Sequence, residues 1–414
     1  MFSARAESAV GRYLLTRVLL CLLSFFPAVA TSDSLTLDLP PLQDQQEAWL
    51  MTIAPGEIYW QRFGHNAIWL REPGLELDHT FNFGYFDFEQ ANFLKRFVTG
   101  RMLYQALAFD AQSELRAYAG EGRAIRAQRL NLSPEQYERL RDHLVWHVQP
   151  ANRDYLYDYY LDNCSTRIRD AIDLALGGAL SEATRQQPAA ANFRDHTRRL
   201  TRVTFWYYLG LESVLGMPVD RAISRWDEMF LPEIVAETVA SSEGMGQQGV
   251  LTKEEVLIFP GQVEQGAVTR SSTGWRYLVA ALGLLLVLGV SLKAGSGAMP
   301  GLRNRLTRGL ARSWLLFTAG LGVILLVLWI FTDHRVVAPN LNLLLLNPLF
   351  MFMLGRRFVR PLFWLVSASG VLALLQWPLL GWQYGVDVLA LVLPLNMAAS
   401  WVLYRVSTEN RAMA

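Results

Sequence analysis

The chain has 414 residues, enough for two or three domains, with 52% hydrophobic residues and a formal net charge of +1 at pH 7. A net charge this close to zero argues against a nucleic-acid-binding protein, because such proteins carry a strongly basic surface. The apolar residues concentrate at the extreme N-terminus and after Trp275, so the chain divides into a leader, a central region and an apolar C-terminal region.

Residues 1–30 have the pattern of a secretory signal. Three arginines accompany a short apolar run, Val18–Phe26, and the segment Pro27–Ala30 ends it with an A-x-A cleavage pattern. An uncleaved membrane anchor is the alternative, but the apolar run is short for a span. No small residue precedes Cys21, which disfavours a lipoprotein-type signal. We therefore expect the processed chain to begin outside the cytoplasmic membrane.

The sequence pattern of residues 31–272 predicts an extracytoplasmic α+β domain. Short apolar and aromatic runs, separated by Pro-Gly turns, indicate several strands. The predicted strands are Glu47–Ala54, His65–Leu70, His79–Phe86, Met102–Phe109 and Ala124–Leu130. The predicted helices are a short one over Glu89–Phe97, one opened by a capping box at Ser133, and one that begins near Cys164.

Residues 273–405 predict an all-α membrane domain with five helices. The apolar segments are 275–292, 313–332, 341–355, 361–381 and 385–404, and the third is short and broken by Asn347-Pro348. Lysine and arginine cluster between the first and second segments, between the third and fourth, and after the fifth. The positive-inside rule places these connections in the cytoplasm and residues 31–272 outside, in agreement with the leader.

Cys164 is expected to be the only cysteine of the processed chain, because the other cysteine, Cys21, lies in the predicted leader. A lone thiol in an oxidising compartment usually has a function or is deeply buried. Asp162 or Asn163 is a natural N-cap for the helix that follows, so Cys164 is expected at a helix N-terminus, where the helix dipole stabilises a thiolate. A buried, inert cysteine is the alternative interpretation.

A thiol nucleophile needs a base within hydrogen-bonding reach and a third group that orients the base. Among the six histidines, His65 is the best candidate because it follows Phe63-Gly64 at the start of a strand. A structural strand histidine is the alternative. His143 and His147 share a helical face at a spacing that could bind a metal, which is the alternative interpretation, but no third ligand is evident. We predict ordinary surface or boundary histidines here, no metal site and no cofactor.

Two segments, Phe63–Ile68 and Tyr160–Asp170, resemble the signature motifs of the Lnb N-terminal periplasmic domain family. The later segments Leu209–Asp220 and Trp226–Pro232 are also similar to that family, and the resemblance covers roughly residues 45–240. The order of histidine before cysteine is similar to the circularly permuted NlpC/P60-type papain-like fold. The resemblance therefore implies an α+β papain-like domain followed by the five-span bundle.

The resemblance also implies a multi-pass inner-membrane enzyme, a lipoprotein N-acyltransferase. Such an enzyme moves an acyl chain from a phospholipid donor to the N-terminal amine of a lipoprotein acceptor. Cys164 would then be the nucleophile and His65 the base. Asn82, on the following strand, is the expected orienting group, with His79 and Tyr85 as alternatives.

The backbone N–H of Cys164 is a candidate oxyanion donor, and Asn163 and Asp162 are further candidates for the substrate or oxyanion site. Asn342 is a polar residue inside an apolar segment, which suggests a substrate path or a helix–helix hydrogen bond. Two other functions remain open, a membrane-anchored cysteine hydrolase and a non-catalytic binding protein. A cell-wall hydrolase needs only one anchor, so the five-span bundle favours a lipid substrate.

Overall fold

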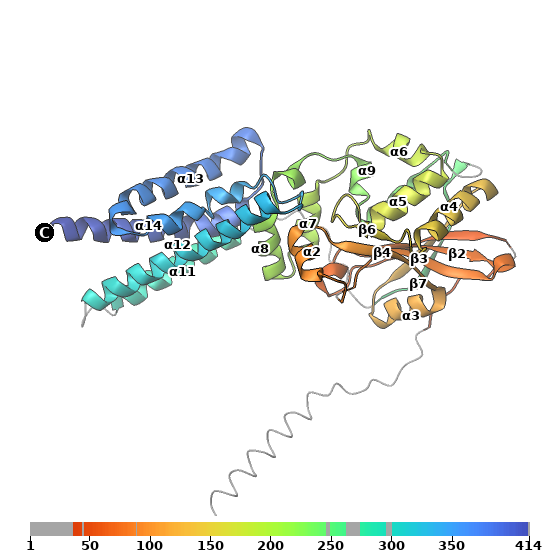
Figure 1. The fold of residues 1–414 in the computed structure, drawn as a ribbon, viewed down its shortest axis with the longest axis horizontal. Coiled ribbons are helices and arrows are strands. Elements are labelled where there is room, and N and C mark those ends of the chain that lie inside the picture. The colour runs from red at the N-terminus through yellow and green to blue at the C-terminus, as the bar shows by residue number, and fades with distance from the viewer. Residues whose placement is uncertain are drawn as a thin grey trace, which may run out of the picture.

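A computed structural model describes residues 36–43, 45–87, 89–245, 249–261, 274–294 and 300–412. The predicted leader, with Cys21, lies outside these residues. Figure 1 shows a domain built around a β-sheet beside an elongated bundle of helices, with the C-terminus at the end of the bundle remote from the sheet. The predicted division into an α+β domain and a helical membrane domain agrees with this architecture.

In the described part of the chain, the sheet of the N-terminal domain has seven strands in the order β6-β4-β3-β2-β1-β5-β7, and every neighbouring pair is antiparallel. Five of the strands correspond to the predicted runs, and β6 and β7 were not predicted. The strands are β1 Glu47–Ile53, β2 His65–Glu72, β3 Leu77–Tyr85, β4 Leu103–Asp110, β5 Ile125–Leu130, β6 Asp154–Leu156 and β7 Thr252–Phe259.

Helices cover both faces of this sheet (Figure 1), with α3 on one face and α4, α5 and α10 on the other. The helices of the domain are α2 Phe93–Thr99, α3 Ala111–Gly120, α4 Pro134–His147, α5 Cys164–Ala175, α6 Ala179–Thr184, α7 Phe193–Thr201, α8 Phe205–Val214, α9 Arg225–Glu228 and α10 Pro232–Ser241. The capping box predicted at Ser133 is present at the start of α4. The helix α3 was not predicted.

The central strand β1 shows how the two faces are stabilised. Trp49, Met51 and Ile53 pack into the core on the α3 face, whereas Ala48 and Leu50 pack into the larger core on the α5 face. Alternate side chains of a strand point to opposite faces, so a strand that is covered on both sides must be apolar throughout. This burial explains the continuous apolar run in the sequence.

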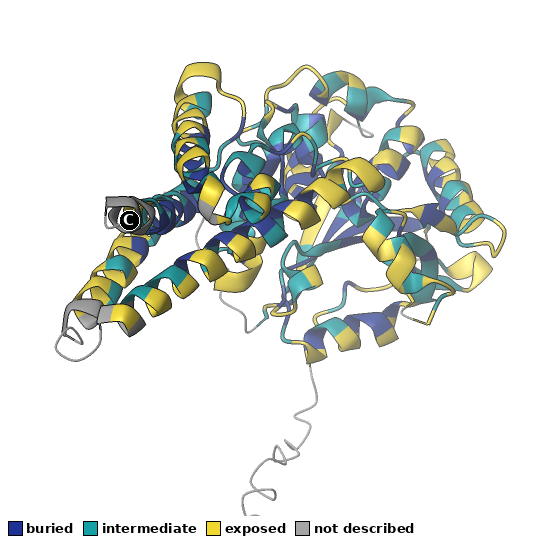
Figure 2. Ribbon diagram, turned by 60° about the vertical axis from the view of Figure 1, so that its left-hand side comes forward, coloured by how far each residue is buried: buried dark blue, intermediate teal, exposed yellow. Residues whose placement is uncertain are grey.

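Among the residues that the structure describes, the C-terminal bundle contains three helices long and apolar enough to cross a membrane, over Asn304–Phe331, Val359–Leu380 and Val386–Arg405. Its α-helices are α11 Gly274–Ala294, α12 Pro300–Phe331, α13 Val359–Leu380 and α14 Val386–Ala412. Figure 2 shows exposed residues along the outward sides of this bundle. They include large apolar side chains, such as Leu286 at 68% exposed, which membrane lipid would cover.

The third predicted segment is not one α-helix. It forms two 3-10 helices, η6 Leu341–Leu344 and η7 Pro348–Met353, which are separated at the predicted break. A third, η8 Arg356–Phe358, precedes α13. The side chain of Asn347 accepts a hydrogen bond from the backbone of Leu349, and Pro348 has no N–H to continue a helix. These local contacts account for the irregular backbone.

A buried polar contact joins the domain to the bundle. Arg198 of α7 donates a hydrogen bond to Asp387 of α14 at 2.6 Å, and the Tyr208 hydroxyl donates to the same fully buried carboxylate. Asn340 donates to the Val214 carbonyl at 2.8 Å. The sheet domain is therefore held at the end of the bundle at which α14 begins.

Candidate functional site

Cys164 is the first residue of α5, where the sequence placed it. The cap is Asn163, whose side chain accepts a hydrogen bond from the Thr166 backbone at 2.9 Å, while the Thr166 hydroxyl accepts one from the Asn163 backbone at 2.7 Å. This capping box leaves the backbone N–H of Cys164 among the helix donors without an intrahelical partner. The positive end of the helix dipole therefore acts on the thiol.

His65 is the first residue of β2, directly after Gly64. The φ of Gly64 is +80°, and a Cβ at this position would lie 2.9 Å from the carbonyl oxygen of Ile53. Only glycine adopts this backbone without strain, so Gly64 lets the chain pass close to β1 and enter β2 at His65.

The side chains of His65 and Cys164 interact electrostatically with each other, and Asn82 of β3 contacts the same histidine. The Nε2 atom of His65 lies 2.9 Å from Oδ1 of Asn82. Because Nε2 faces the amide, Nδ1 is the nitrogen left for the thiol. The structure thus brings together the three side chains that the sequence predicted as nucleophile, base and orienting group.

The two partners shift each other's pKa in opposite directions. Burial acts most strongly to lower the pKa of His65, but Cys164 and Asn82 raise it overall. Burial likewise acts most strongly to raise the pKa of Cys164, but His65, the Ser165 hydroxyl and the backbone N–H of Asn66 lower it overall. The arrangement favours a thiolate beside an imidazolium.

A buried carboxylate, Glu114 on α3, accepts hydrogen bonds from Asn82 and from two other side chains of β3. The Nδ2 atom of Asn82 donates to it at 2.9 Å and the Tyr85 hydroxyl donates at 3.0 Å, and the Thr80 hydroxyl is a further donor. Glu114 was not predicted as a site residue, because the sequence pattern did not predict α3. An acidic residue in the first turn after the Asp110 cap was the available signal.

The backbone of β3 passes directly beside the thiol at Gly84. The pairing of β3 with β4 shifts register between Phe83 and Tyr85, Gly84 has a φ of +102°, and a Cβ there would lie 3.5 Å from the Cβ of Cys164. Such a bulge locally bends a strand. Here it lets β3 pass against the start of α5.

Aromatic rings form one side of the site. The rings of Tyr104 and Tyr157 stack at 4.1 Å between centroids. Burial, and after it the charge of Cys164, raises the pKa of Tyr104 to about 12 and that of Tyr157 in the same direction. The hydroxyls of both tyrosines therefore stay protonated beside the thiol.

Three other candidates have different roles in the structure. The Asn163 side chain is occupied as the helix cap and also donates to the Phe230 carbonyl at 2.9 Å. Asp162 forms an ion pair with Arg167 at 2.7 Å. Asn342 lies in the buried junction with the bundle, where it donates to the Glu212 carbonyl at 2.9 Å. The structure does not bring Asn342 to Cys164, because its amide is engaged by the backbone of α8.

Within the described residues, no group of three or more histidine, cysteine, aspartate or glutamate side chains gathers as a metal site. The rings of His143 and His147 lie 4.5 Å apart between centroids. Burial, followed by the nearby charges of His143 and Arg167, lowers the pKa of His147 to about 4. This histidine is therefore neutral near pH 7.

Comparison with protein families matches two successive parts of the chain. The model of the Lnb N-terminal periplasmic domain matches residues 43–203, and that of the Lnb transmembrane domain matches residues 280–409. The chain belongs to the Lnb family. As an Lnb family member it is a membrane protein with a periplasmic N-terminal domain, and the first match includes His65, Asn82 and Cys164. No curated protein and no solved structure matches the chain.

Proposed function

We propose that this Lnb family member is a lipoprotein N-acyltransferase of the inner membrane. It transfers an acyl chain from a phospholipid to the N-terminal amine of a lipoprotein through a thioester on Cys164. The observation that carries the proposal is the pairing of Cys164 with His65, which shift each other's pKa in opposite directions while Asn82 holds the histidine at 2.9 Å. A thiolate held beside an imidazolium is an activated nucleophile near neutral pH.

In the first half-reaction the Cys164 thiolate attacks the carbonyl carbon of a phospholipid ester. The carbon–sulfur bond forms and the carbon–oxygen bond of the ester breaks. The leaving glycerol oxygen takes its proton from the His65 imidazolium, which gives a lysophospholipid and an acyl thioester. Asn82 keeps the ring in the required orientation through its contact with Nε2.

In the second half-reaction the lipoprotein amine attacks the thioester carbon. Neutral His65 accepts the proton that the amine loses, the carbon–nitrogen bond of an amide forms, and the sulfur leaves as the thiolate. The backbone N–H of Cys164, at the first position of α5, is the proposed donor to the oxyanion of both tetrahedral intermediates.

The arrangement of the elements supports a papain-like assignment for the domain. A helix that starts at the nucleophile packs on an antiparallel sheet, and the histidine and the asparagine come from neighbouring strands of that sheet. In the proposed papain-like fold, of the permuted NlpC/P60 type, the histidine strand precedes the cysteine helix.

We propose that α11 and the short segment Leu341–Met353 lie in the membrane with the three long helices, which gives five spans in total.

A lipid substrate explains why the thiol domain is joined to such a bundle. Phospholipids are available only at the membrane, and the buried contact of Arg198 with Asp387 holds the domain at the end of the spans. The stacked rings of Tyr104 and Tyr157 provide an apolar wall beside the thiol. These features favour an acyl ester over a soluble peptide as the first substrate.

The test is mass spectrometry of lipoprotein N-termini from cells that contain the wild-type protein, the Cys164→Ala variant or neither. We expect N-termini heavier by one acyl group only with the wild-type protein. Purified protein incubated with phospholipid should also carry one acyl group on the peptide that contains Cys164. Release of free fatty acid without acylated lipoproteins would instead identify a hydrolase, and unchanged function in Cys164→Ala would identify a binding protein.

A further inference from the structure

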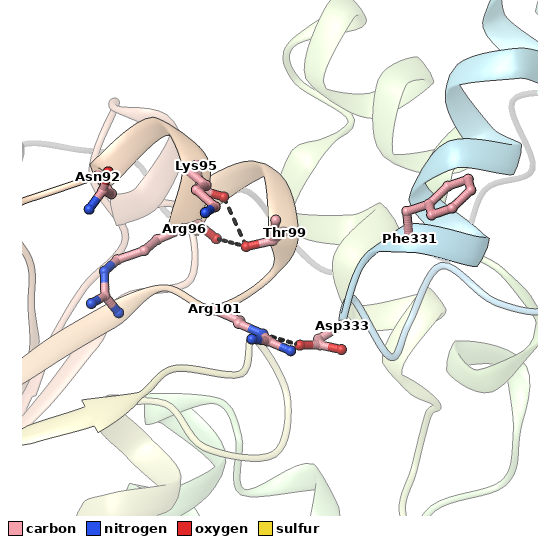
Figure 3. A pocket seen from close by; sticks show the side chains of 7 residues that line it. All are labelled: Asn92, Lys95, Arg96, Thr99, Arg101, Phe331 and Asp333. Atoms are coloured by element: carbon pink, nitrogen blue, oxygen red, sulfur yellow. Dashed lines mark hydrogen bonds and ion pairs between the residues drawn. The ribbon is translucent and has the colours of Figure 1, made fainter.

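A pocket of about 450 Å³ lies where the sheet domain meets the bundle (Figure 3). One wall is α2 with Arg101, which precedes β4, and the other is the end of α12 with Asp333, which follows it. The lining residues are Asn92, Lys95, Arg96, Thr99, Arg101, Phe331 and Asp333.

The pocket lies at the level where a membrane span ends. Phe331 is the last residue of the apolar span Asn304–Phe331 and is 73% exposed. The backbone N–H of Asp333 donates to the Thr99 carbonyl at 2.8 Å, so the two walls are bound to each other. With the domain in the periplasm, this is the depth of the outer-leaflet headgroups.

The pocket carries a net positive charge. Arg101 forms an ion pair with Asp333. Within the described ranges, neither Lys95 nor Arg96 forms an ion pair, and the Arg96 side chain donates a 3.4 Å hydrogen bond to the Ala91 carbonyl. Two positive charges are therefore uncompensated at the same opening.

The helix that carries these two cations also exposes apolar side chains. On α2, Leu94 is 71% exposed, and Phe97 and Val98 are each exposed by nearly half. Cations beside exposed apolar side chains at a bilayer surface are the chemistry that binds lipid headgroups, because acyl chains cover the apolar groups while phosphate pairs with the cations.

We propose that this pocket binds the phosphate of a membrane phospholipid. That this lipid is the acyl donor rests on the function proposed above. Arg101 lies three residues before Tyr104, which interacts electrostatically with Cys164, and an extended chain covers roughly 10 Å in three residues. In a glycerophospholipid only the glycerol backbone separates the phosphate from the ester carbonyls. For this lipid to be the donor, its phosphate must lie at the pocket while an ester reaches the thiol.

Binding is tested with the full-length Cys164→Ala protein in a neutral detergent, in which no turnover occurs. Calorimetric titration uses dihexanoyl phosphatidylglycerol, dihexanoylglycerol without a phosphate, and inorganic phosphate as three separate probes. The double variant Lys95→Glu/Arg96→Glu reverses the two uncompensated charges. The matched control is Arg116→Glu/Lys253→Glu, which reverses two exposed cations on α3 and β7, outside the pocket lining.

We expect the pocket variant to weaken phosphatidylglycerol binding at least tenfold and the control to leave it unchanged. Dihexanoylglycerol should bind equally to both variants, and inorganic phosphate should bind far more weakly than the lipid, because exposed ion pairs contribute little without the apolar contacts. Equal phosphatidylglycerol affinity in the pocket variant and the control overturns the site. Inorganic phosphate binding as tightly as the lipid overturns its assignment to a lipid headgroup.

A second measurement separates this site from the proposed reaction. Thioester formation on Cys164 is followed by mass spectrometry in protein that retains the cysteine. If the thioester forms but the charge reversal changes neither affinity nor KM, the pocket assignment fails and the acyl-transfer proposal stands. If the charge-dependent binding is present but no thioester forms, the pocket assignment stands and the acyl-transfer proposal fails.

Discussion

The Nδ2 atom of Asn82 lies 2.9 Å from a carboxylate oxygen of Glu114. This contact determines which way the amide points, because only the NH₂ end of the amide can donate to the carboxylate. The Oδ1 end then faces His65, so Nε2 of the histidine must carry a proton in order to donate to it. Glu114 is thus a positioning residue that acts on the thiol through Asn82 and His65.

Changing Glu114 to glutamine should impair thioester formation without loss of the fold. A glutamine can present either end to Asn82, so the amide is no longer held in one orientation. Loss of a buried, charge-assisted hydrogen bond of this kind corresponds to roughly 1–3 kcal/mol, or about a 5- to 150-fold lower rate. The measurement is the rate of acylation of Cys164 by phospholipid.

The control for this change is Glu138→Gln, at an exposed position on α4. A purely structural role for Glu114 would lower the Tm but leave the pH profile of thiol alkylation unchanged. A positioning role would move the inflection of that profile as well. An unchanged profile together with a normal acylation rate would remove Glu114 from the mechanism.

The alkylation of Cys164 by iodoacetamide should report the thiolate directly. Since His65 lowers the pKa of this thiol, the wild-type protein should react rapidly at a pH below the ordinary thiol pKa of about 8.5. In His65→Ala the inflection should move to higher pH, because burial remains and the positive partner is lost. His143→Ala, on α4, is the control and should leave the inflection in place.

Asp387→Ala should destabilise the junction between the domain and the bundle. Among the described residues, the change leaves the partly buried Arg198 with the more distant Glu212, at 3.8 Å, as its acidic partner. Removal of one member of a buried ion pair costs about 3–5 kcal/mol, and the remaining partner places this case in the lower part of that range. The measurement is thermal unfolding in detergent, with Asp142→Ala, in the exposed pair with Arg141, as the control. Equal Tm values for the two variants would contradict the prediction.

Glu228 should make the folded domain less stable in acid. Burial acts most strongly to raise the pKa of this carboxyl, but hydrogen bonds from His196 at 2.8 Å and Arg225 at 3.0 Å lower it overall. A carboxyl with a lowered pKa in the folded state stabilises the protein above its unfolded-state pKa of about 4.3. This stabilisation is lost as the pH falls from there through the folded-state pKa.

The corresponding measurement compares the Tm of the wild-type protein with that of Glu228→Gln from pH 7 to pH 3. The difference between the two should be largest at pH 7 and should shrink below about pH 4.3. Glu182→Gln, at an exposed position of α6, should show no such pH-dependent difference. A Tm difference that is constant over the whole range would show that Glu228 does not titrate in this way.

The sequence was sufficient for the features that depend on neighbouring residues. The strands from β1 to β5, the capping box at Ser133 and the start of a helix at Cys164 all follow from the order of apolar, turn and capping residues. The break at Asn347-Pro348 was predicted for the same reason. The catalytic roles of His65, Asn82 and Cys164 stay predictions, although their side chains meet in the structure.

What the sequence alone left undecided depends on residues that are distant along the chain. Glu114 contacts Asn82 because α3 packs against β3. The Asn342 amide donates to the backbone of α8 and does not contact the thiol. Lys95 and Arg96 of α2 line a pocket because the end of α12 packs opposite them and forms its second wall. Local hydrogen bonds and apolar periodicity select the helices and strands, but the packing of the two cores and the bundle decides which polar side chains face one another.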